Sequence, residues 1–417
     1  MSVSLADIRQ AAETIRGAVA RTPIVAAPRI SAVAGVDLLL KLENLQRTGS
    51  FKARGALVRL LRLDTEARRR GVIAMSAGNH AQGVAYHCQR LGIPATIVMP
   101  KLTPFTKVEN TSAYGARVIL EGEGLAEAAE YAKQLGERDK LTFIHPYEDV
   151  SIIAGQGTVG LELVDDAPDV DTVVVPVGGG GLSAGIGIAV KSLRPNVQLI
   201  GVQASLFPDM VRRLRPKTAL SNESTDRARS TLAEGIAVKR PGEMTCEILR
   251  RHFDDFMLVN EAGIEHAVHM LLTEEKILAE GAGAAPLAAV LAAPKRFTGR
   301  RVALIVSGGN IDPRIVASIL MRGLAAAGHM ARLRVEITDA PGMLARVASA
   351  IAKAGGNIIE IYHQRLFRDV PVTRADLDVI VETRDLRHLR EIIAGLEGAG
   401  LSVRQLGNTA AEGPSPG

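Results

Sequence analysis

The segment VVVPVGGGGLSAGIGIAV, residues 173–190, joins two apolar runs through four consecutive glycines. The valines before the glycines favour a buried strand, and the small and apolar residues after them favour a buried helix. Backbone amides from Gly178 to Gly181, together with the amide end of the helix, can bind one anion such as a phosphate group. The segment therefore predicts an α/β fold with an anion site where a strand meets a helix.

Three other uses of such a glycine-rich turn compete with this interpretation. A nucleoside triphosphate loop ends in Gly-Lys-Ser/Thr, but the first lysine after the glycines is Lys191. A dinucleotide site matches in part, because Gly179, Gly181 and Ala184 fit GxGxxA, while Gln203 stands in place of the acid that binds ribose hydroxyls. Tight helix packing alone rarely requires four successive glycines, given their entropic cost. The pattern favours the phosphate of a non-nucleotide cofactor.

A second segment, RTGSFKARGA at residues 47–56, places Lys52 in a turn of small and polar residues that leads into a helix. The positive end of the helix dipole disfavours the ammonium form and leaves a more nucleophilic amine. A lysine in this position is by itself usually solvated. An anion site and a reactive amine are, however, the two groups that pyridoxal phosphate needs, and this cofactor would account for both segments.

Length and composition indicate a large globular protein of two or three domains. The chain has 417 residues, of which 47% are hydrophobic. No apolar run approaches the roughly 18 residues of a membrane span, and the start MSVSLADIRQAAE lacks the pattern of a signal peptide. We expect a cytoplasmic protein without membrane contact. The two cysteines, Cys88 and Cys246, form no CxxC pair or Cys/His cluster, so neither disulfides nor a zinc site are expected.

The charge pattern argues against a nucleic-acid partner. Lys and Arg number 50 against 45 Asp and Glu, which gives a net charge of +5 scattered along the chain. The densest basic runs, at residues 68–70 and 212–217, contain no aromatic residues. Such runs are more typical of a solvated surface than of a phosphate-binding strip.

Two rhythms divide the chain. Up to about residue 325, apolar runs rich in Val and Ile alternate with longer helical segments, which predicts parallel strands covered by helices. We expect a catalytic domain over 1–325 with two lobes and a cleft between them, the smaller lobe at roughly 53–150. The runs are GVIAM, ATIVMP, ARVIL, DTVVVPV, VQLIGVQ and RVALIVS.

After residue 330 the apolar pattern changes. ARLRVEIT, NIIEIYHQR and ADLDVIVET alternate with period two, and two helical patterns and a final LSVRQL lie around them. The order βαββαβ is typical of a ferredoxin-like module, which we assign to residues 326–406. The tail GNTAAEGPSPG, residues 407–417, is expected to be disordered.

Four motifs carry a family resemblance. GSFKARGA (49–56), SAGNHAQGVA (76–85), GGGGLSAG (178–185) and SGGN (307–310) are similar in order and spacing to those of fold type II pyridoxal-phosphate enzymes. Within that group the chain resembles the threonine dehydratases (threonine ammonia-lyases) that carry a single C-terminal ACT domain. The resemblance covers nearly the whole chain. It implies two-lobed, tryptophan synthase β-like open twisted sheets followed by a ferredoxin-like ACT domain.

The resemblance also implies roles for single residues. Lys52 would be the Schiff-base lysine and Gly178 to Gly181 the phosphate loop. Asn79 would hydrogen-bond the cofactor's ring hydroxyl oxygen, and Ser307 would face the pyridine nitrogen. The substrate carboxylate would bind at a helix start formed by Ser76, Gly78, Asn79 and His80. As structural alternatives, Ser76 and Asn79 could cap that helix and Ser307 could close a turn.

The implied reaction is deamination of L-threonine to 2-oxobutanoate and ammonia, with Lys52 as the general base at Cα. L-serine is a second expected substrate. A serine/threonine racemase and a dehydratase specific for serine or 3-hydroxyaspartate are the alternatives. Racemases similar to this chain carry serine where Ala77 stands, and alanine cannot return a proton to the opposite face of the substrate.

Two departures from the family pattern concern acidic residues. Relatives with a cation site near the cofactor carry an acid where Gln203 stands, although Asp209 remains as a possible ligand, so we predict no metal. Glu234 occupies a position where the family usually has aspartate. We expect no change of function from this replacement, because it keeps the carboxylate.

The C-terminal module suggests amino-acid regulation. TDAPGMLARVASAIAKAGGNI, residues 338–358, resembles the strand, turn and helix of ACT domains. The resemblance implies an effector such as isoleucine or valine, bound where two domains pair in a homodimer or homotetramer. A purely structural dimerisation domain is the alternative. The implied effector residues are Asp339, Pro341, Gly342 and Asn357.

Overall fold

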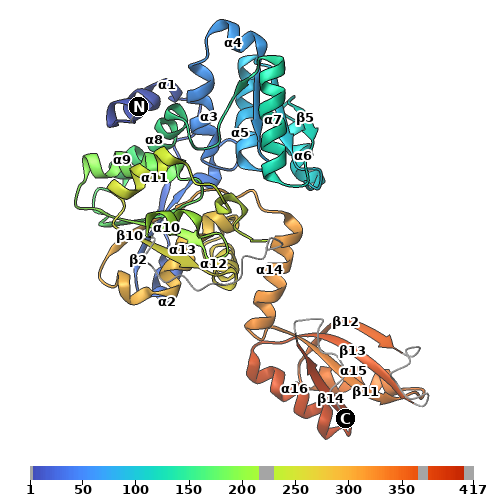
Figure 1. Cartoon of the computed structure of the whole chain (residues 1–417). Helices are drawn as coiled ribbons and strands as arrows, with labels where there is room; N and C mark the ends of the chain where they lie inside the picture. The colour runs from blue at the N-terminus through green and yellow to red at the C-terminus, as the bar shows by residue number, and fades with distance from the viewer. Residues whose placement is uncertain (1–2, 216–229, 365–373, 408–417) are drawn as a thin grey trace. The chain divides into compact units, whose positions relative to one another are not determined.

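The computed structural model describes residues 3–215, 230–364 and 374–407. The chain divides into two compact units, Met1–Asp312 and Pro313–Gly417 (Figure 1). The sequence analysis places the boundary after residue 325, whereas the structure assigns α14 (Pro313–Ala326) to the second unit. This helix packs on the strand that follows it, β11 (Met330–Thr338). The predicted tail lies outside the described residues from 408 onward.

The larger lobe of the first unit is built on a six-stranded sheet with the order β1-β2-β10-β7-β8-β9. β1 is antiparallel to β2, and every other neighbouring pair is parallel. Strands β7 and β10 lie in the middle and are almost entirely buried, which explains their continuous apolar sequences. The strands are β1 (Ile24–Ala26), β2 (Asp37–Leu42), β7 (Thr172–Pro176), β8 (Gln198–Ala204), β9 (Asp255–Val259) and β10 (Arg301–Val306).

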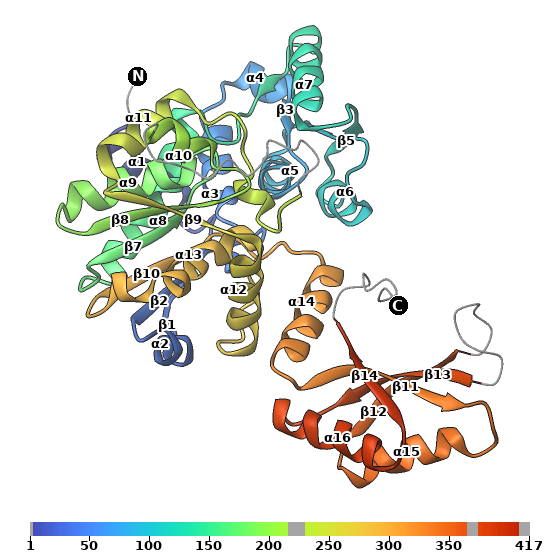
Figure 2. The same ribbon diagram turned by 60° about the horizontal axis from the view of Figure 1, so that its bottom comes forward.

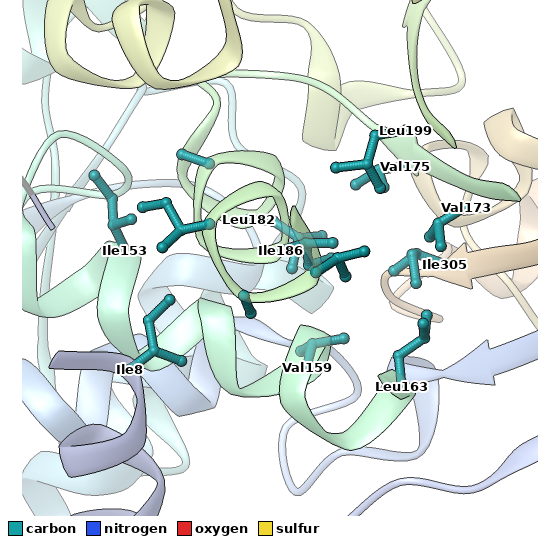
Figure 3. Close-up of a cluster of buried hydrophobic side chains, with 14 of the residues drawn as sticks. Ile8, Ile153, Val159, Leu163, Val173, Val175, Leu182, Ile186, Leu199 and Ile305 are labelled. Carbon is teal, nitrogen blue, oxygen red and sulfur yellow. The ribbon is translucent and has the colours of Figure 1, made fainter. Parts of the chain in front are cut away.

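Helices cover both faces of this sheet. α13 (Gly281–Ala292) packs on one face, and α8 (Val150–Asp166) and α9 (Gly181–Leu193) cover the other. Figure 3 shows the apolar side chains that fill the space between this second pair and the strands. They include Val159 and Leu163 of α8, Ile186 of α9, and Val173, Val175, Leu199 and Ile305 of the sheet.

The small residues that follow the glycine turn serve helix packing. A Cβ built on Gly185 of α9 would lie 2.4 Å from the backbone nitrogen of Gly157 of α8. The backbones of the two helices therefore touch, and any side chain at Gly185 would push them apart. Packing of this kind accounts for the glycines inside α9 but not for the turn before it.

The smaller lobe holds a four-stranded parallel sheet with the order β5-β4-β3-β6. Its strands are β3 (Val72–Met75), β4 (Ala95–Met99), β5 (Arg117–Leu120) and β6 (Thr142–Phe143). One face packs against α7 (Leu125–Asp139), and the other against α3 (Lys52–Leu61) and α5 (Asn79–Leu91). α6 (Phe105–Ser112) packs on α5.

The remaining helices complete the first unit. α1 begins with a capping box, in which Ser4 and Asp7 satisfy each other's backbone amides. The α-helices are α1 (Leu5–Ile15), α2 (Pro28–Ala34), α4 (Thr65–Arg70), α10 (Asp209–Leu214), α11 (Glu243–His252) and α12 (Glu261–Thr273). The 3-10 turns are η1 (Glu43–Leu45), η2 (Glu234–Ile236) and η3 (Pro294–Phe297).

The second unit has the predicted order βαββαβ after α14. Its antiparallel sheet has the order β12-β13-β11-β14, and Figure 2 shows α15 and α16 on one face of it. Four alternate residues of β11 (Ala331, Leu333, Val335 and Ile337) point into the core beneath these helices. The elements after β11 are α15 (Met343–Lys353), β12 (Asn357–Gln364), β13 (Arg374–Glu382), α16 (Leu386–Gly398) and β14 (Ser402–Leu406).

The predicted fold class is confirmed: two mostly parallel sheets covered by helices are followed by a ferredoxin-like module. Each of the six apolar runs named from the sequence is a strand. Among the described residues, no helix combines the length and the apolar character that a membrane span would require.

Candidate active site

Lys52 is the first residue of α3, as the sequence predicts. Its Nζ donates a hydrogen bond of 2.8 Å to the carbonyl oxygen of Pro146. Burial lowers the pKa of this amine to about 8, and the nearby Glu280 carboxylate opposes that shift. The start of the helix also disfavours the ammonium form. An appreciable fraction of the amine is therefore neutral near physiological pH, as a nucleophile or a base requires.

A buried ion network holds the helix that carries Lys52. Arg54, two residues further on, pairs through Nη2 with Oε1 of Glu43 at 2.7 Å and through Nη1 with Oε1 of Glu162 at 2.6 Å. Lys41 reaches the other oxygen of Glu162 at 2.6 Å. All four side chains are largely or fully buried, so each charge depends on its partners. The network ties the start of α3 to the larger lobe.

The glycine turn connects β7 to α9 and presents free amides. Within the described residues, no acceptor pairs with the backbone N–H groups of Gly178 to Gly181. Gly180, with φ of 93°, adopts the left-handed conformation that glycine allows. The carbonyl of Gly179 accepts a hydrogen bond of 2.7 Å from Oγ1 of Thr245, which orients the turn. The turn is thus a preformed site for an anion.

The segment 76–80 forms the start of α5 in the smaller lobe. Oγ of Ser76 accepts a hydrogen bond of 3.1 Å from the amide of Gly78, so this serine stabilises the turn, as the structural alternative proposes. Nothing lies within 4 Å of a Cβ built on Gly78, so the turn faces open space. His80 is buried, and its Nε2 donates to the carbonyl of Ile144 at 2.9 Å, since a carbonyl can only accept. Burial lowers the pKa of His80 to about 3, so the ring is neutral.

Asn79 does not cap its own helix. Its Nδ2 donates to Oε1 of Glu280 at 2.8 Å, and its Oδ1 accepts from Nδ2 of Asn310 at 2.7 Å. Burial raises the pKa of Glu280 to about 7, against the effect of the Asn79 hydrogen bond. The amide of Asn79 is therefore held from two sides.

Ser307 follows β10 and is only 2% exposed. Its carbonyl oxygen accepts a hydrogen bond of 3.1 Å from the amide of Phe51, the residue before Lys52. In the described parts of the chain its hydroxyl has no hydrogen-bond partner. The hydroxyl thus remains open to a ligand that sits beside Lys52.

The structure brings these residues together from both lobes. Pro146 accepts from Lys52, and the ring of the next residue, Tyr147, packs against Gly179. Phe51 links Lys52 to Ser307 through the backbone. Glu280 hydrogen-bonds Asn79 and interacts electrostatically with Lys52. Lysine, glycine turn, amide and serine therefore surround one place between the lobes.

Sequence reasoning did not identify three residues of this site. Glu280 is an isolated acid in a run of Ala and Gly that opens α13, and Tyr147 lies in a loop between the lobes. Asn310 belongs to the SGGN motif but had no assigned role. A signal does exist for Glu280, because a single charge within an otherwise apolar buried run is expected to have a specific partner.

Glu234 has a partner in the other lobe. Its carboxylate forms an ion pair with Nζ of Lys107 in α6. Both groups also influence Glu280 electrostatically, so the pair lies near the site. The replacement of aspartate by glutamate therefore keeps a carboxylate that bridges the lobes.

The possible cation position contains an amide. Gln203 is fully buried, and its Oε1 accepts from the backbone nitrogen of Val211 at 3.1 Å. Burial raises the pKa of Asp209. Among the described residues, no group of three or more His, Cys, Asp or Glu side chains is arranged to hold a metal ion.

The implied effector residues do not form one site within a chain. Asp339, Pro341 and Gly342 follow the end of β11, where Thr338 pairs with Arg374. Asn357 pairs with Glu382, which in turn pairs with Met330 at the start of β11. The two places are separated by the length of β11, on the order of 25 Å at about 3.3 Å per residue.

Comparison with known proteins identifies the family. The model of the family described as "Pyridoxal-phosphate dependent enzyme" matches residues 15–308, and that of the ACT domain matches residues 331–398.

The chain belongs to the pyridoxal-phosphate dependent enzymes. Its predicted fold type II architecture, cofactor and ACT domain are confirmed by these matches. An L-threonine ammonia-lyase of Thermotoga maritima is 44% identical over 97% of this chain and 100% of that protein. One of Geobacter sulfurreducens is 42% identical over 95% and 98%.

Solved structures agree with this assignment. A threonine deaminase from the bacterium abbreviated T.th. is 41% identical, with a TM-score of 0.69 over 74% of this chain and 99% of that one. Maize serine racemase is 32% identical, with a TM-score of 0.71 over 78% and 99%.

The residues at the site fit pyridoxal phosphate. The glycine turn has amides without an acceptor for the phosphate, and Lys52 supplies an amine of lowered pKa. Asn79 keeps one N–H beyond the one that it donates to Glu280, and the Ser307 hydroxyl has no partner in the described residues. Each polar group of the cofactor thus has a complementary group of the protein.

Proposed function

We propose that this chain is an L-threonine ammonia-lyase that converts L-threonine to 2-oxobutanoate and ammonia, with L-serine as a second substrate. Water leaves from Cα and Cβ of the substrate, and a water molecule returns when the product hydrolyses. The net change is the loss of ammonia. The observation that carries the proposal is the match over 97% of the chain, catalytic part and ACT domain together, to a protein named for this activity.

The cofactor would be held by groups that otherwise have no protein partner. Amides of Gly178 to Gly181 would bind its phosphate, and the remaining N–H of Asn79 would bind its ring oxygen. The Ser307 hydroxyl would face its ring nitrogen. A hydroxyl at this position, unlike a carboxylate, does not hold that nitrogen protonated, which favours elimination over transamination.

Pyridoxal phosphate supplies an electron sink for the substrate's Cα. Lys52 would hold the cofactor through Nζ and then, as the free amine, remove the Cα proton. Its pKa of about 8 suits this role, because the neutral amine is accessible near physiological pH. The hydrogen bond from Nζ to Pro146 directs the amine, and the ion network of Arg54 fixes the helix that carries it.

The substrate carboxylate would bind at the start of α5. The backbone amides at Asn79 and His80 begin this helix, and the turn at Gly78 faces open space. Helix starts favour anions through their free N–H groups and their dipole. The neutral ring of His80 stabilises the segment through its hydrogen bond to Ile144.

A racemase of serine or threonine is the second candidate, favoured by the similarity to serine racemase structures. Ala77 argues against it, because racemisation needs an acid on the face of the substrate opposite Lys52. A dehydratase specific for serine or for 3-hydroxyaspartate uses the same groups and differs only in the side chain it accepts.

The ACT domain would bind isoleucine or valine where two copies of the chain pair. This arrangement is favoured because Asp339, Pro341 and Gly342 lie at one end of the sheet and Asn357 at the other, so that a partner must complete the site. A homodimer is the smallest assembly that does so, and a homotetramer is built from two of them. The enzyme would act in the cytoplasm.

Steady-state turnover of L-threonine, L-serine and 3-hydroxyaspartate by the purified holoenzyme tests the function. We expect threonine to have the highest kcat/KM and to release 2-oxobutanoate and ammonia in equal amounts. Turnover of serine alone would favour the serine-specific dehydratase, and no turnover of any of the three would refute the proposal.

A further inference from the structure

We propose that Glu280 and Asn310 are positioning residues of the active site, which fix the side-chain amide of Asn79 so that one N–H is kept for the cofactor's ring oxygen. This inference rests on the proposed function, since it assigns Asn79 to the cofactor. It follows from the hydrogen bonds of three side chains that come from segments far apart in the chain.

The first step is the orientation of Asn310. Its Nδ2 donates both to the carbonyl oxygen of Thr48 at 2.8 Å and to Oδ1 of Asn79 at 2.7 Å. A backbone carbonyl only accepts, so the nitrogen of Asn310 must face Thr48. Both N–H groups of Asn310 are then used. Asn79 must in turn present its oxygen to Asn310.

The second step is the other side of Asn79. Its Nδ2 lies 2.8 Å from Oε1 of Glu280. An ionised carboxylate only accepts, so it agrees with the orientation that Asn310 sets from the opposite side. An amide nitrogen carries two N–H groups, and Glu280 takes one of them. The second is the N–H that we assign to the cofactor.

Glu280 is itself fixed by the larger lobe. Its backbone nitrogen donates to the carbonyl of Gly308 at 3.0 Å. Oε1 lies 2.7 Å from a Cβ built on Gly308 and 3.3 Å from one built on Gly235. Glycine at both positions leaves room for the carboxylate. From this place Glu280 reaches Asn79 in the smaller lobe, so the hydrogen bonds cross between the lobes.

The charges around Glu280 make the contact sensitive to pH. Lys52 of α3, Lys107 of α6 and Glu234 of η2 face it together with the amide of Asn79. Burial raises its pKa to about 7. Hydrogen bonds to an ionised acceptor are stronger than those to a neutral one, so the hold on Asn79 weakens as the pH falls through this value.

The test compares Glu280→Leu, Glu280→Gln and Asn310→Ala with the wild-type protein. Pyridoxal phosphate is titrated into each apoprotein, and the dissociation constant and the pH dependence of the visible absorption band are measured. Leucine removes the acceptor, and we expect affinity to fall roughly tenfold, as for the loss of one hydrogen bond to a charged group. Glutamine keeps an acceptor, so affinity should stay within about threefold while the pH dependence near neutrality disappears.

Asn310→Ala should weaken affinity as Glu280→Leu does, and the double variant should lose less than the product of the two effects, because both act through Asn79. Glu275→Gln is the matched control. This carboxylate accepts from the amides of Arg29 and Ile30 at the start of α2, and no contact joins it to Asn79 in the described residues. It should leave both measurements unchanged.

Two outcomes separate this inference from the proposed function. A wild-type protein that gains no visible band with pyridoxal phosphate refutes both. A wild-type protein that binds the cofactor, with Glu280→Leu and Asn310→Ala binding it equally well and with the same pH dependence, refutes the positioning role alone. Thermal unfolding of each apoprotein shows whether a weakened variant is folded.

Discussion

The ring of Tyr147 lies so close to Gly179 that a Cβ built on the glycine would be 2.2 Å from the ring's Cδ1. Tyr147 is held in place, because its hydroxyl donates to the carbonyl of Arg240 at 2.7 Å. The glycine turn is thus covered by a ring that belongs to the loop next to Lys52, since Pro146 accepts the hydrogen bond from the lysine. The phosphate site and the reactive amine are coupled through two adjacent residues.

The first prediction follows from this contact. Gly179→Ala should weaken the binding of pyridoxal phosphate by about tenfold or more, because the ring or the turn must move to admit a methyl group. The double variant Gly179→Ala, Tyr147→Ala should recover most of the affinity. Gly124→Ala is the control, since nothing lies within 4 Å of its Cβ position. Equal affinities of Gly179→Ala and wild type would contradict the role of the turn.

The second prediction concerns Lys52. Lys52→Ala should fold but lose turnover by at least about a thousandfold, because it removes both the attachment point of the cofactor and the base. The visible absorption of the bound cofactor should change as well. The control is Lys101→Ala, whose ammonium lies at the surface and pairs with Glu121. Activity of Lys52→Ala within tenfold of wild type would overturn the assignment of the active site.

Local motifs explain what the sequence could predict. Lys52 and the glycine turn each bring their chemistry in a few consecutive residues, so their spacing alone points to an amine and an anion site. Asn79 and Glu280 are 201 residues apart, and nothing in either neighbourhood indicates the other. A contact of this kind depends on how two lobes meet, which local pattern does not encode.

The strand β2 shows the same limit within the fold. Its sequence DLLLKL contains Lys41, which argues against a central buried strand when the chain is read alone. The structure buries Lys41 completely, because Glu162 of α8 neutralises it at 2.6 Å. The partner is 121 residues away, and only the folded chain reveals the pair. Strands β7 and β10, without such charges, were predicted directly.

The third prediction is a loss of stability in acid through His87. This side chain is fully buried, and burial, together with the charge of Arg90, lowers its pKa to about 4 from the usual 6.5. Between these values the unfolded chain binds the proton and the folded chain does not. The contribution of the neutral ring is therefore complete above about pH 6.5 and is lost as the pH falls toward 4.

Chemical denaturation near pH 7.5 and near pH 5 measures this effect, which should amount to about 2 kcal/mol for one such group. His87→Phe should reduce the difference in unfolding free energy between the two pH values by that amount. His266→Gln, at an exposed position, should not. An unchanged pH dependence in His87→Phe would show that this ring is not one of the groups responsible.

The fourth prediction separates regulation from catalysis. A chain that ends at Asp312, where the first compact unit ends, should fold and deaminate threonine but no longer respond to isoleucine or valine. The full chain should be inhibited by at least one of them and should show a raised Tm in its presence. Inhibition by isoleucine that persists in the shortened chain would place the effector site in the catalytic unit.

The fifth prediction is that the enzyme eliminates water and does not racemise. A racemase needs an acid on each face of the substrate, one of them opposite Lys52. Ala77 lies in the turn before α5, between Ser76, whose hydroxyl accepts from the amide of Gly78, and Gly78 itself, which faces open space. Its methyl group carries no transferable proton. After Lys52 removes the Cα proton, a proton can return only from Lys52 and so only to the original face.

Incubation of the holoenzyme with L-serine in deuterated water, followed by chiral separation of the products, tests this prediction. We expect pyruvate and deuterated L-serine, with D-serine formed at least about a hundredfold more slowly than pyruvate, as for a reaction without its second acid. Ala77→Ser is the matched variant, because it adds a hydroxyl at the position where similar racemases have one. It should raise the share of D-serine. D-serine formed by the wild-type enzyme as fast as pyruvate would make the racemase the better assignment, and would require a proton donor on the opposite face other than residue 77.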